Sequence, residues 1–284
     1  MFNPSLVPLK TTLNIKGEIL DLSTPLVMGV INVTPDSFHK KSRVLSVETT
    51  VQQAGIMLSE GAGIIDIGGH STRPNAEPVS EAEEIDRVVP GIKAILAEFH
   101  ETYISVDTFR SGVAREAVMA GATIVNDISG GLLDSNMFKT VADLKCPYIL
   151  GHIQGSFETM MSSTQYGNLI GDIMDHFTIA SRELKKLGVY DIIIDPCFGF
   201  SKDLDQNYTL LKNLAYFRNL GMPILAGISR KSMIYKFLGG TPEDALNGTT
   251  ALNMIALMSG ASILRVHDVK EAIETVRLYQ KTWV

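Results

Sequence analysis

Residues 103–127 read YISVDTFRSGVAREAVMAGATIVND. The apolar run Tyr103–Val106 stops at Asp107. The amphipathic stretch Arg110–Ala120 follows, and a second apolar run, Thr123–Val125, stops at Asn126. Short β-branched runs on either side of a stretch with helical spacing are typical of a β-α-β unit, in which the two strands are parallel. The polar residues that end parallel strands then lie on one side of the sheet.

The same order recurs along the chain, with apolar runs alternating with longer amphipathic stretches and glycines following several of these stretches, as at helix ends. We predict strands within Leu26–Ile31, Ile64–Ile67, Tyr103–Val106, Thr123–Val125, Tyr148–Leu150, Ile192–Ile194, Ile224–Ala226 and Ser262–Leu264. We predict helices within Ser46–Glu60, Glu81–Phe99, Arg110–Ala120, Asp134–Leu144, Ile170–Leu187, Asp205–Leu220, Glu243–Ser259 and Asp268–Lys281.

Strands that alternate with helices in this number favour an α/β fold of the closed (β/α)8 type, a TIM barrel. A doubly wound open sheet gives the same local pattern and is the alternative. Before the first strand, the segment Thr11–Leu22 is expected to form a short N-terminal hairpin around Lys16-Gly17. No linker interrupts the 284 residues, so we expect one domain over residues 1–284.

Composition argues against several classes of protein. The net charge of −6 and the pI near 5.5 give no sign of a basic surface for nucleic acid. Cys146 and Cys197 provide neither a disulfide framework nor zinc-ligand spacing. The N-terminus lacks a secretory signal pattern, and the uncharged stretch Ala245–Leu264 contains Asn247 and Asn253, which suit a buried helix better than a membrane span. We expect a cytoplasmic protein that binds neither nucleic acid nor membrane.

The last two predicted strands lead into cationic residues. Ser229-Arg230-Lys231-Ser232 follows the seventh strand, and Arg265 and His267 lie at the end of the eighth. Loops at these positions of a barrel often bind phosphate, for which arginine offers a planar fork and lysine a point charge. The pattern predicts an anion site that contains Lys231, Arg265 and His267. For Arg230 alone, a solvated charge that caps a helix end is an equally good interpretation.

Acids and an amide end other strands. Asp107, Asn126 and Asp195 each follow apolar residues, where a carboxylate needs hydrogen-bond donors. Two acids beside an amide suit a flat heterocycle with adjacent N–H donors and a ring carbonyl. Internal salt bridges to Lys231 or Arg265 are the alternative.

Three residues near these strand ends have simpler interpretations. Asp66 stands before Gly68-Gly69, and a strand-end acid before a glycine turn is often only a cap. His70 is a single loop histidine, which is more often solvated than catalytic. Cys197 has no neighbouring feature that activates a thiolate, so we expect it to pack in the core or a loop.

Eight motifs occur in order along the chain. They are Asn32-Val-Thr-Pro-Asp-Ser-Phe38, Asp66-Ile-Gly-Gly69, Ser71-Thr-Arg-Pro74, Ser105-Val-Asp-Thr108, Asn126-Asp-Ile128, Asp195-Pro-Cys-Phe-Gly-Phe200, Ser229-Arg-Lys-Ser232 and Arg265-Val-His-Asp-Val269. Together they resemble the dihydropteroate synthase family, from about Thr12 to the last helix. The resemblance implies a (β/α)8 barrel enzyme of folate biosynthesis. Members of this family condense 6-hydroxymethyl-7,8-dihydropterin pyrophosphate with p-aminobenzoate, which releases pyrophosphate and forms 7,8-dihydropteroate.

The resemblance also implies roles for individual residues. The pterin would be held by Asp107, Asn126, Asp195 and Lys231. The pyrophosphate would be held by Asn32, Arg265 and His267, with Asn32 also binding Mg²⁺. The p-aminobenzoate pocket would be bordered by Thr72, Arg73, Pro74, Phe38, Phe200 and Ser232. The residues that take part in catalysis would be Asp107, Asp195, Lys231 and Asp36, and the segment from Asp36 to Phe38 would cover the site.

The chain departs from the usual family pattern at four points. His39-Lys-Lys-Ser-Arg43 stands where an acidic, glycine-rich stretch is usual. His70 replaces a usual glutamate, Gly151 a methionine, and Cys197 a glycine. None of these positions is a principal ligand, so the departures bear on loop closure, pocket shape and turnover.

Other functions fit part of the pattern. A pterin-dependent methyltransferase shares the barrel but does not need the cationic cluster. A non-catalytic pterin-binding paralogue would account for the altered first and second loops, and an aldolase that forms a Schiff base on Lys231 is the most distant alternative. The family resemblance further implies small-molecule substrates and a homodimer.

Overall fold

The computed structural model describes residues 9–33, 40–70 and 79–283. In these ranges eight parallel strands form one sheet, in the order β8-β7-β6-β5-β4-β3-β10-β9. The strands are β3 (Leu26–Asn32), β4 (Ile64–Gly68), β5 (Tyr103–Asp107), β6 (Ile124–Asp127), β7 (Tyr148–Gly151), β8 (Ile192–Asp195), β9 (Leu225–Ala226) and β10 (Ile263–Val266). The two edges meet at a parallel bridge between Ile194 and Ile224, where the Ile194 N–H donates to the Pro223 carbonyl at 2.9 Å. The sheet therefore closes into the predicted barrel and is not an open sheet.

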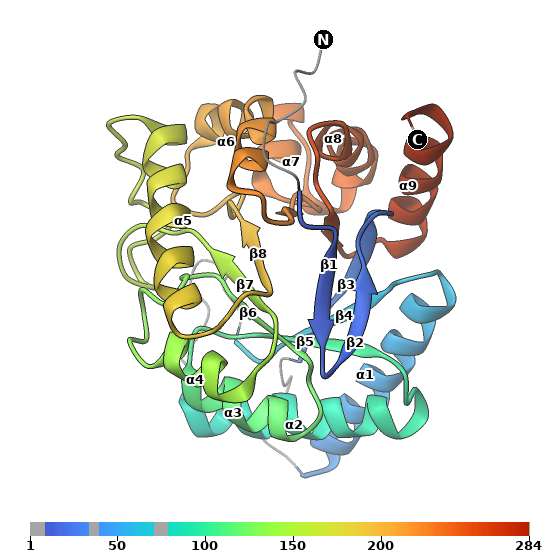
Figure 1. Ribbon diagram of the computed structural model, residues 1–284. Coiled ribbons are helices and arrows are strands. Elements are labelled where there is room, and N and C mark those ends of the chain that lie inside the picture. The colour runs from blue at the N-terminus through green and yellow to red at the C-terminus, as the bar shows by residue number, and fades with distance from the viewer. Residues whose placement is uncertain (1–8, 34–39, 71–78, 284) are drawn as a thin grey trace.

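Helices surround the strands (Figure 1). They are α1 (Lys40–Ser59), α2 (Glu81–Glu98), α3 (Ser111–Met119), α4 (Met137–Leu144), α5 (Leu169–Lys186), α6 (Leu204–Lys212), α7 (Ser232–Leu238), α8 (Leu246–Met258) and α9 (Val269–Trp283), with short 3-10 turns at η1 (Leu214–Leu220) and η2 (Pro242–Ala245). No helix in the described part of the chain combines the length and the apolar character needed to cross a membrane.

Two of the differences between the predicted and the observed helices have a clear local cause. The stretch predicted to be one helix up to Leu220 breaks after α6, where the Asn213 side chain donates to the Thr209 carbonyl at 2.8 Å and so competes with the helical backbone bonds. Helix α7 is not among the predicted helices. It spans seven residues between Arg230 and Gly239, which both have positive φ, and so short a helix gives too few turns for a periodic signal.

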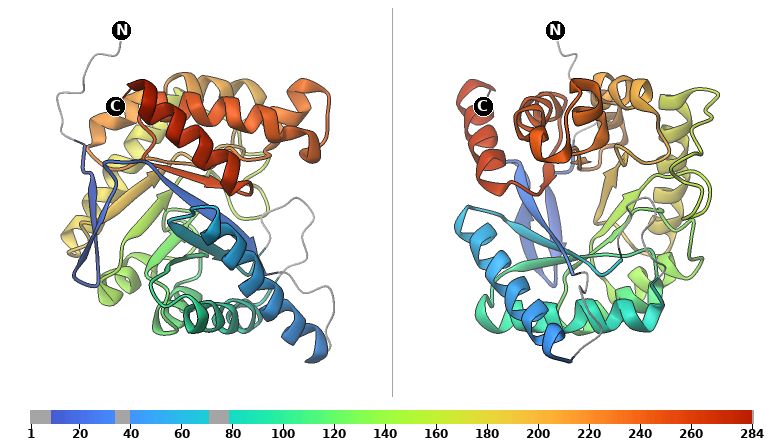
Figure 2. Two further views of the ribbon diagram at one scale, coloured as in Figure 1. Left: turned by 90° about the vertical axis from the view of Figure 1, so that its right-hand side faces the viewer. Right: turned by 180° about the vertical axis from the view of Figure 1, so that it is seen from behind.

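The hairpin of β1 (Thr12–Ile15) and β2 (Glu18–Asp21) forms where predicted, and its turn at Lys16 and Gly17 has positive φ. It lies against one end of the barrel (Figure 2). Its apolar side chains join the inward side chains at the N-terminal ends of the strands in one buried cluster, formed by Leu13, Ile15, Leu22, Met28, Ile64, Ile124, Ile149, Ile193, Leu225 and Ile263. The hairpin therefore closes the N-terminal end of the barrel.

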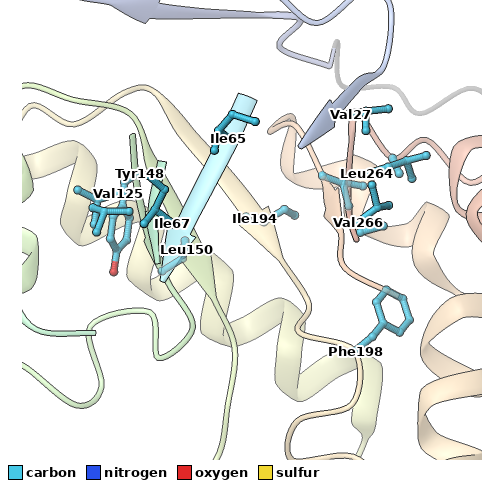
Figure 3. Close-up of a cluster of buried hydrophobic side chains, with 14 of the residues drawn as sticks. Val27, Ile65, Ile67, Val125, Tyr148, Leu150, Ile194, Phe198, Leu264 and Val266 are labelled. Atoms are coloured by element: carbon cyan, nitrogen blue, oxygen red, sulfur yellow. The ribbon is translucent and has the colours of Figure 1, made fainter. Parts of the chain in front are cut away.

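Successive strand side chains alternate between the inside of the barrel and the helices. The outward set packs beneath the helices and is mostly apolar, as Figure 3 shows for Ile65, Val125, Ile194 and Leu264. Asp127 on β6 is an exception, and this buried carboxylate accepts from the Tyr148 hydroxyl at 2.7 Å. On the inward face the character changes along four of the strands, since a buried isoleucine is followed two residues later by a polar side chain. The pairs are Ile64 and Asp66, Ile124 and Asn126, Ile193 and Asp195, and Ile263 and Arg265. The barrel thus places polar groups at the C-terminal end of its interior.

Candidate active site

Arg265 on β10 lies at the centre of the polar end of the barrel. Its Nε donates to Asp66 Oδ2 at 2.6 Å, and its Nη2 donates to Asp107 Oδ2 at 2.6 Å. Burial alone would lower the pKa of Arg265, but the two carboxylates outweigh burial and raise it, so the guanidinium stays charged. A guanidinium has five N–H donors, and these two bonds leave donors for a further anion.

Asp66 is fully buried on β4 and is a shared acceptor. Its Oδ2 accepts from Asn126 Nδ2 at 3.2 Å as well as from Arg265, whereas Oδ1 has no hydrogen-bond partner within the described residues. The interpretation of Asp66 as a cap is therefore wrong. The sequence did contain a signal, because Asp66 is two residues beyond Ile64 on a strand that is otherwise apolar and so shares its inward face.

Asp107 ends β5 beside this pair. Burial raises the pKa of Asp107 to about 7, with Asp66 adding to the rise and Arg265 opposing it. The alternative considered for this acid, an internal salt bridge to Arg265, is what the structure shows. Asp107 and Arg265 are thus held together as one charged unit.

Asp195 and Lys231 form the other side of the site. Asp195 is buried at the end of β8, and its Oδ1 accepts from the Cys197 N–H at 2.7 Å. Burial raises the pKa of Asp195, and nearby Lys231 opposes the rise. Burial likewise lowers the pKa of Lys231 to about 8, against the effect of Asp195. Lys231 Nζ donates to the Phe198 carbonyl and lies 4.5 Å from the centre of the Phe200 ring.

Asn32 and His267 lie at the outer edge of the site. Asn32 ends β3 and is exposed, and a Cβ placed on Gly68 would lie 3.7 Å from Asn32 Oδ1 and 3.5 Å from Asp107 Cβ. The side chains of Asn32 and Asp107 therefore lie on either side of Gly68, close to the space that a larger side chain would fill. His267 is exposed just beyond β10, where Ser229 Oγ lies 3.0 Å from its Nδ1 and accepts from its backbone N–H at 3.1 Å.

The structure assembles most of the predicted site residues that it describes. Five of them interact directly or through one neighbour, and these are Asn126, Asp107, Asp195, Lys231 and Arg265. Four more lie next to these in space or sequence, and they are Asn32, Phe200, Ser232 and His267. The remaining predicted site residues lie outside the described residues, and these are Asp36, Phe38, Thr72, Arg73 and Pro74.

Arg230 does not take part in this cluster. Its Nε and Nη2 donate to the two carboxylate oxygens of Asp268, both at 2.8 Å, and its Nη1 donates to the Pro242 carbonyl at 2.9 Å. This bidentate ion pair ties the loop before α7 to the start of α9. For Arg230 the structural interpretation is therefore the one that holds.

The departures from the family pattern have local explanations. A Cβ at Gly151 would lie 2.4 Å from the Ile128 carbonyl oxygen, so this backbone path requires glycine. Cys197 has a φ of 55° and is buried, with its Sγ 3.3 Å from the His152 N–H. Burial raises the pKa of the Cys197 thiol, so it is protonated and fills space as expected.

His70 differs from its interpretation as a solvated histidine. Its ring stacks on Phe157 at a centroid distance of 4.6 Å and lies 5.7 Å from Phe109. Both ring nitrogens are buried without a hydrogen-bond partner in the described ranges, and burial together with Arg110 and Arg87 lowers the pKa of His70. The imidazole therefore acts as an aromatic surface between the loops after β4, β5 and β7.

The residues described above define a class of protein. A closed (β/α)8 barrel whose C-terminal strand ends carry interlocked acids, an amide and cations is a barrel enzyme that binds a polar small molecule.

Comparisons with known proteins identify the family within this class. A family model described as pterin binding enzyme matches residues 28–267. The chain is 43% identical over 269 residues to the dihydropteroate synthase of Escherichia coli, covering 94% of this chain and 95% of that protein. The chain therefore belongs to the dihydropteroate synthase family of pterin binding enzymes.

Solved structures agree with this assignment. The Yersinia pestis dihydropteroate synthase in a sulfonamide drug complex superposes with a TM-score of 0.88 at 41% identity, covering 95% of this chain and 98% of that one. The Xanthomonas albilineans dihydropteroate synthase with 4-aminobenzoic acid gives a TM-score of 0.87 at 36% identity, covering 96% and 98%. The predicted barrel and the predicted family are both confirmed.

Proposed function

We propose that the protein condenses 6-hydroxymethyl-7,8-dihydropterin pyrophosphate with p-aminobenzoate to give 7,8-dihydropteroate and pyrophosphate. The observation that carries this proposal is the gathering of acids and cations at one end of the barrel, where Asp66 and Asp107 bind Arg265 directly and Asp195 interacts electrostatically with Lys231. The substrate pair needs acceptors for the N–H groups of a pterin beside cations for a diphosphate. These residues supply both.

The hydrogen bonds that already exist indicate which atoms are left for the pterin. Asp195 uses Oδ1 for the Cys197 N–H, whereas Oδ2 has no partner among the residues described and is the acceptor for the pterin amino and ring N–H groups. Asn126 uses Nδ2 for Asp66, so its Oδ1 is the second acceptor. Lys231 Nζ is the donor on this side and reaches a ring carbonyl or ring nitrogen.

The charges fit the bond that must break. Cleavage of the methylene C–O bond leaves a delocalised pterin cation and a pyrophosphate anion, and the amine of p-aminobenzoate then forms the new C–N bond and loses a proton. Asp107 and Asp195 stabilise the cation, while Arg265, Asn32 and His267 stabilise the leaving group. The aromatic amine attacks through a neutral lone pair, so no activated nucleophile of the protein is required.

Asn32 fits a place in a Mg²⁺ site. This ion takes oxygen ligands, retains several waters and is usually held by one or two protein oxygens plus substrate phosphates. Asn32 offers one exposed amide oxygen at the end of β3, and the described residues contain no group of three or more His, Cys, Asp or Glu able to hold a metal. We propose that the diphosphate and water supply the other ligands, and that the ion neutralises the charge of the leaving group.

Phe200 and Ser232 are proposed to border p-aminobenzoate together with Phe38, Thr72, Arg73 and Pro74. Phe200 offers an aromatic face beside Lys231, and Ser232 is the first residue of α7, next to Lys231 in sequence. Because a dihydropteroate synthase has been solved in a sulfonamide drug complex, we expect sulfonamides to compete with p-aminobenzoate here.

We further propose that the protein works in the cytoplasm as a homodimer. Phe237 and Leu238 on α7 and Ile255 on α8 are exposed apolar side chains on helices that pack against each other, and symmetric subunits commonly bury such a surface. Sedimentation of the wild type and of Phe237→Glu tests this. A dimer that Phe237→Glu converts to monomer supports the proposal, and a monomeric wild type refutes it.

A direct assay tests the reaction. Purified protein is mixed with Mg²⁺, the pterin pyrophosphate and p-aminobenzoate, and dihydropteroate and pyrophosphate are measured by mass spectrometry. Formation of both products in equal amounts is the expected result. Saturable binding of the pterin pyrophosphate without product would instead favour a non-catalytic pterin-binding protein.

A further inference from the structure

Lys202 is a buried lysine with no part in the proposed reaction. Its side chain lies behind the loop after β8, and Nζ is 2.9 Å from the Phe200 carbonyl oxygen and 3.3 Å from the Cys197 carbonyl oxygen. The carbonyl oxygen and Nδ1 of His152 are each 3.4 Å away. In the described ranges its Nζ makes no ion pair. Burying an ammonium is costly unless acceptors surround it, and here backbone carbonyls do so.

The turn that Lys202 holds has an unusual backbone. Cys197, Gly199 and Ser201 have φ values of 55°, 81° and 52°. Each non-glycine residue in this left-handed region costs about 1 kcal/mol or more. A turn of this kind persists only when its surroundings fix it. The hydrogen bonds around the turn therefore show which residues hold it in this conformation.

The carbonyls of this turn point toward two ammonium groups. Those of Cys197 and Phe200 face Lys202, while that of Phe198 accepts from Lys231. Buried carbonyls without donors would be destabilising. The turn is thus held between a lysine of the site and a lysine behind it.

Within the turn the Phe200 N–H donates to the Cys197 carbonyl at 3.2 Å, and further bonds connect the turn to its surroundings. The Gly199 N–H donates to Asn207 Oδ1 at 2.6 Å, and Ser201 Oγ accepts from the Gln154 N–H at 2.8 Å and donates to the Met160 carbonyl at 2.9 Å. These bonds fix the two flanks of Phe200 but not its own carbonyl. Lys202 makes the bond to that carbonyl, and the Phe200 ring lies over Lys231.

We infer that Lys202 is a positioning residue for the p-aminobenzoate side of the site, because its ammonium fixes the turn 197–201 and thereby the ring of Phe200. The inference rests on the proposed function for the identity of the substrate. The role of the Lys202 ammonium in fixing the shape of the turn does not depend on the proposed function. Lys202 acts on the substrate only through Phe200.

The first test compares Lys202→Met, which keeps side-chain length and removes the charge, with Lys212→Met, an exposed lysine on α6. Losing the hydrogen bonds of one charged group predicts a KM for p-aminobenzoate about tenfold higher in Lys202→Met. The dissociation constant of the pterin pyrophosphate should change by less than about threefold, because Asp195 and Asn126 are untouched. Lys212→Met should match the wild type. Equal changes for both substrates, or none, would overturn the inference.

A double-mutant cycle with Phe200→Leu tests whether Lys202 acts through Phe200. If it does, the double variant raises the KM for p-aminobenzoate hardly more than Phe200→Leu alone. Effects that multiply would show that the two residues act separately and would overturn the inference. Should Lys202→Met fail to fold, Lys202→Gln keeps a donor of similar length, and its melting curve decides whether it can replace Lys202→Met in the cycle.

Hydrogen exchange gives a reading that does not depend on activity. In Lys202→Met the backbone amides of residues 197–201 should exchange at least about fivefold faster than in the wild type, while those of α6 stay the same. Unchanged exchange rates at residues 197–201 would contradict the inference. A wild type that makes no dihydropteroate sinks the proposed function instead, and the exchange measurement then still decides the role of Lys202.

Discussion

The two ends of the barrel interior are built from the same strands and have opposite character. At the N-terminal end, Ile64, Ile124, Ile193 and Ile263 pack with the hairpin in an apolar cluster. Two residues further along the same strands the inward side chains are Asp66, Asn126, Asp195 and Arg265, a step of about 7 Å. The difference shows that stability and recognition are separated along each strand. Substitutions at the two ends should therefore have separable effects.

Arg265→Met should have the largest effect, because Arg265 serves both stability and binding. Its loss leaves the fully buried Asp66 and the partly exposed Asp107 without their cation, which costs about 3–5 kcal/mol of the free energy of unfolding. It also removes the main cation for the diphosphate, so the KM for the pterin pyrophosphate should rise steeply. Urea unfolding and steady-state kinetics measure the two effects.

A second substitution separates these two roles of Arg265. In Arg265→Met with Asp66→Asn, one of the unpaired charges is gone, so part of the lost stability should return while substrate capture stays poor. Recovery of both properties would show that Arg265 only neutralises acids and does not bind the diphosphate.

Asp195→Asn should affect activity with little effect on stability. The amide keeps the shape of the side chain but replaces an acceptor of N–H groups by a donor, which predicts a loss of about 10²–10³-fold in kcat/KM. The free energy of unfolding should change little, since a buried charge is also removed. Activity within tenfold of the wild type would contradict the role given to Asp195.

Ile193→Ala tests the opposite end of the same strand. Ile193 is fully buried beneath the hairpin, and removing its side chain should cost about 2–4 kcal/mol of stability through lost burial and a cavity. Both KM values should stay within about twofold of the wild type at a temperature where the variant is folded. A change in KM comparable to that of the variants at the polar end, Arg265→Met and Asp195→Asn, would show that the two ends are coupled.

The sequence predicted the parts of the fold that repeat. Each predicted strand appears, since β-branched runs that end in polar residues recur with helical stretches between them. It failed at α7, which is too short to give a periodic signal, and at the end of α6, where a single side-chain hydrogen bond of Asn213 does not show in the periodicity.

Site residues were predictable where a charged or amide side chain follows an apolar strand. Asp107, Asn126, Asp195, Lys231 and Arg265 were all selected in this way and come together in the structure. The salt bridge between Asp107 and Arg265 was considered as an alternative, but most partnerships were not predictable, because they depend on side-chain geometry across several strands. Arg230 pairs with Asp268, and Lys202 follows a loop with no pattern that sets it apart from a solvated lysine.

The pH dependence of stability should arise at the polar end and is the smallest effect. Next to β7, His152 is buried, and burial, together with Lys202, lowers the pKa of His152 to about 2. A histidine in the unfolded chain has a pKa near 6.5. Between this value and the lower pKa in the native state, His152 is protonated in the unfolded chain but neutral in the folded protein. Stability is therefore fully present above pH 6.5 and is lost as the pH falls toward 2, by about 1–2 kcal/mol between pH 6.5 and 5 from this group.

Urea unfolding of the wild type and His152→Asn at pH 6.5 and 5 measures this contribution. The asparagine cannot titrate, so the variant should lose about 1–2 kcal/mol less than the wild type over this interval. His100→Asn, which replaces an exposed histidine, is the matched control. If the wild type and His152→Asn lose stability in parallel, the buried imidazole of His152 does not couple folding to protons, and the acid sensitivity of the barrel must come from other groups, such as His70, whose pKa is also lowered, or the carboxylates.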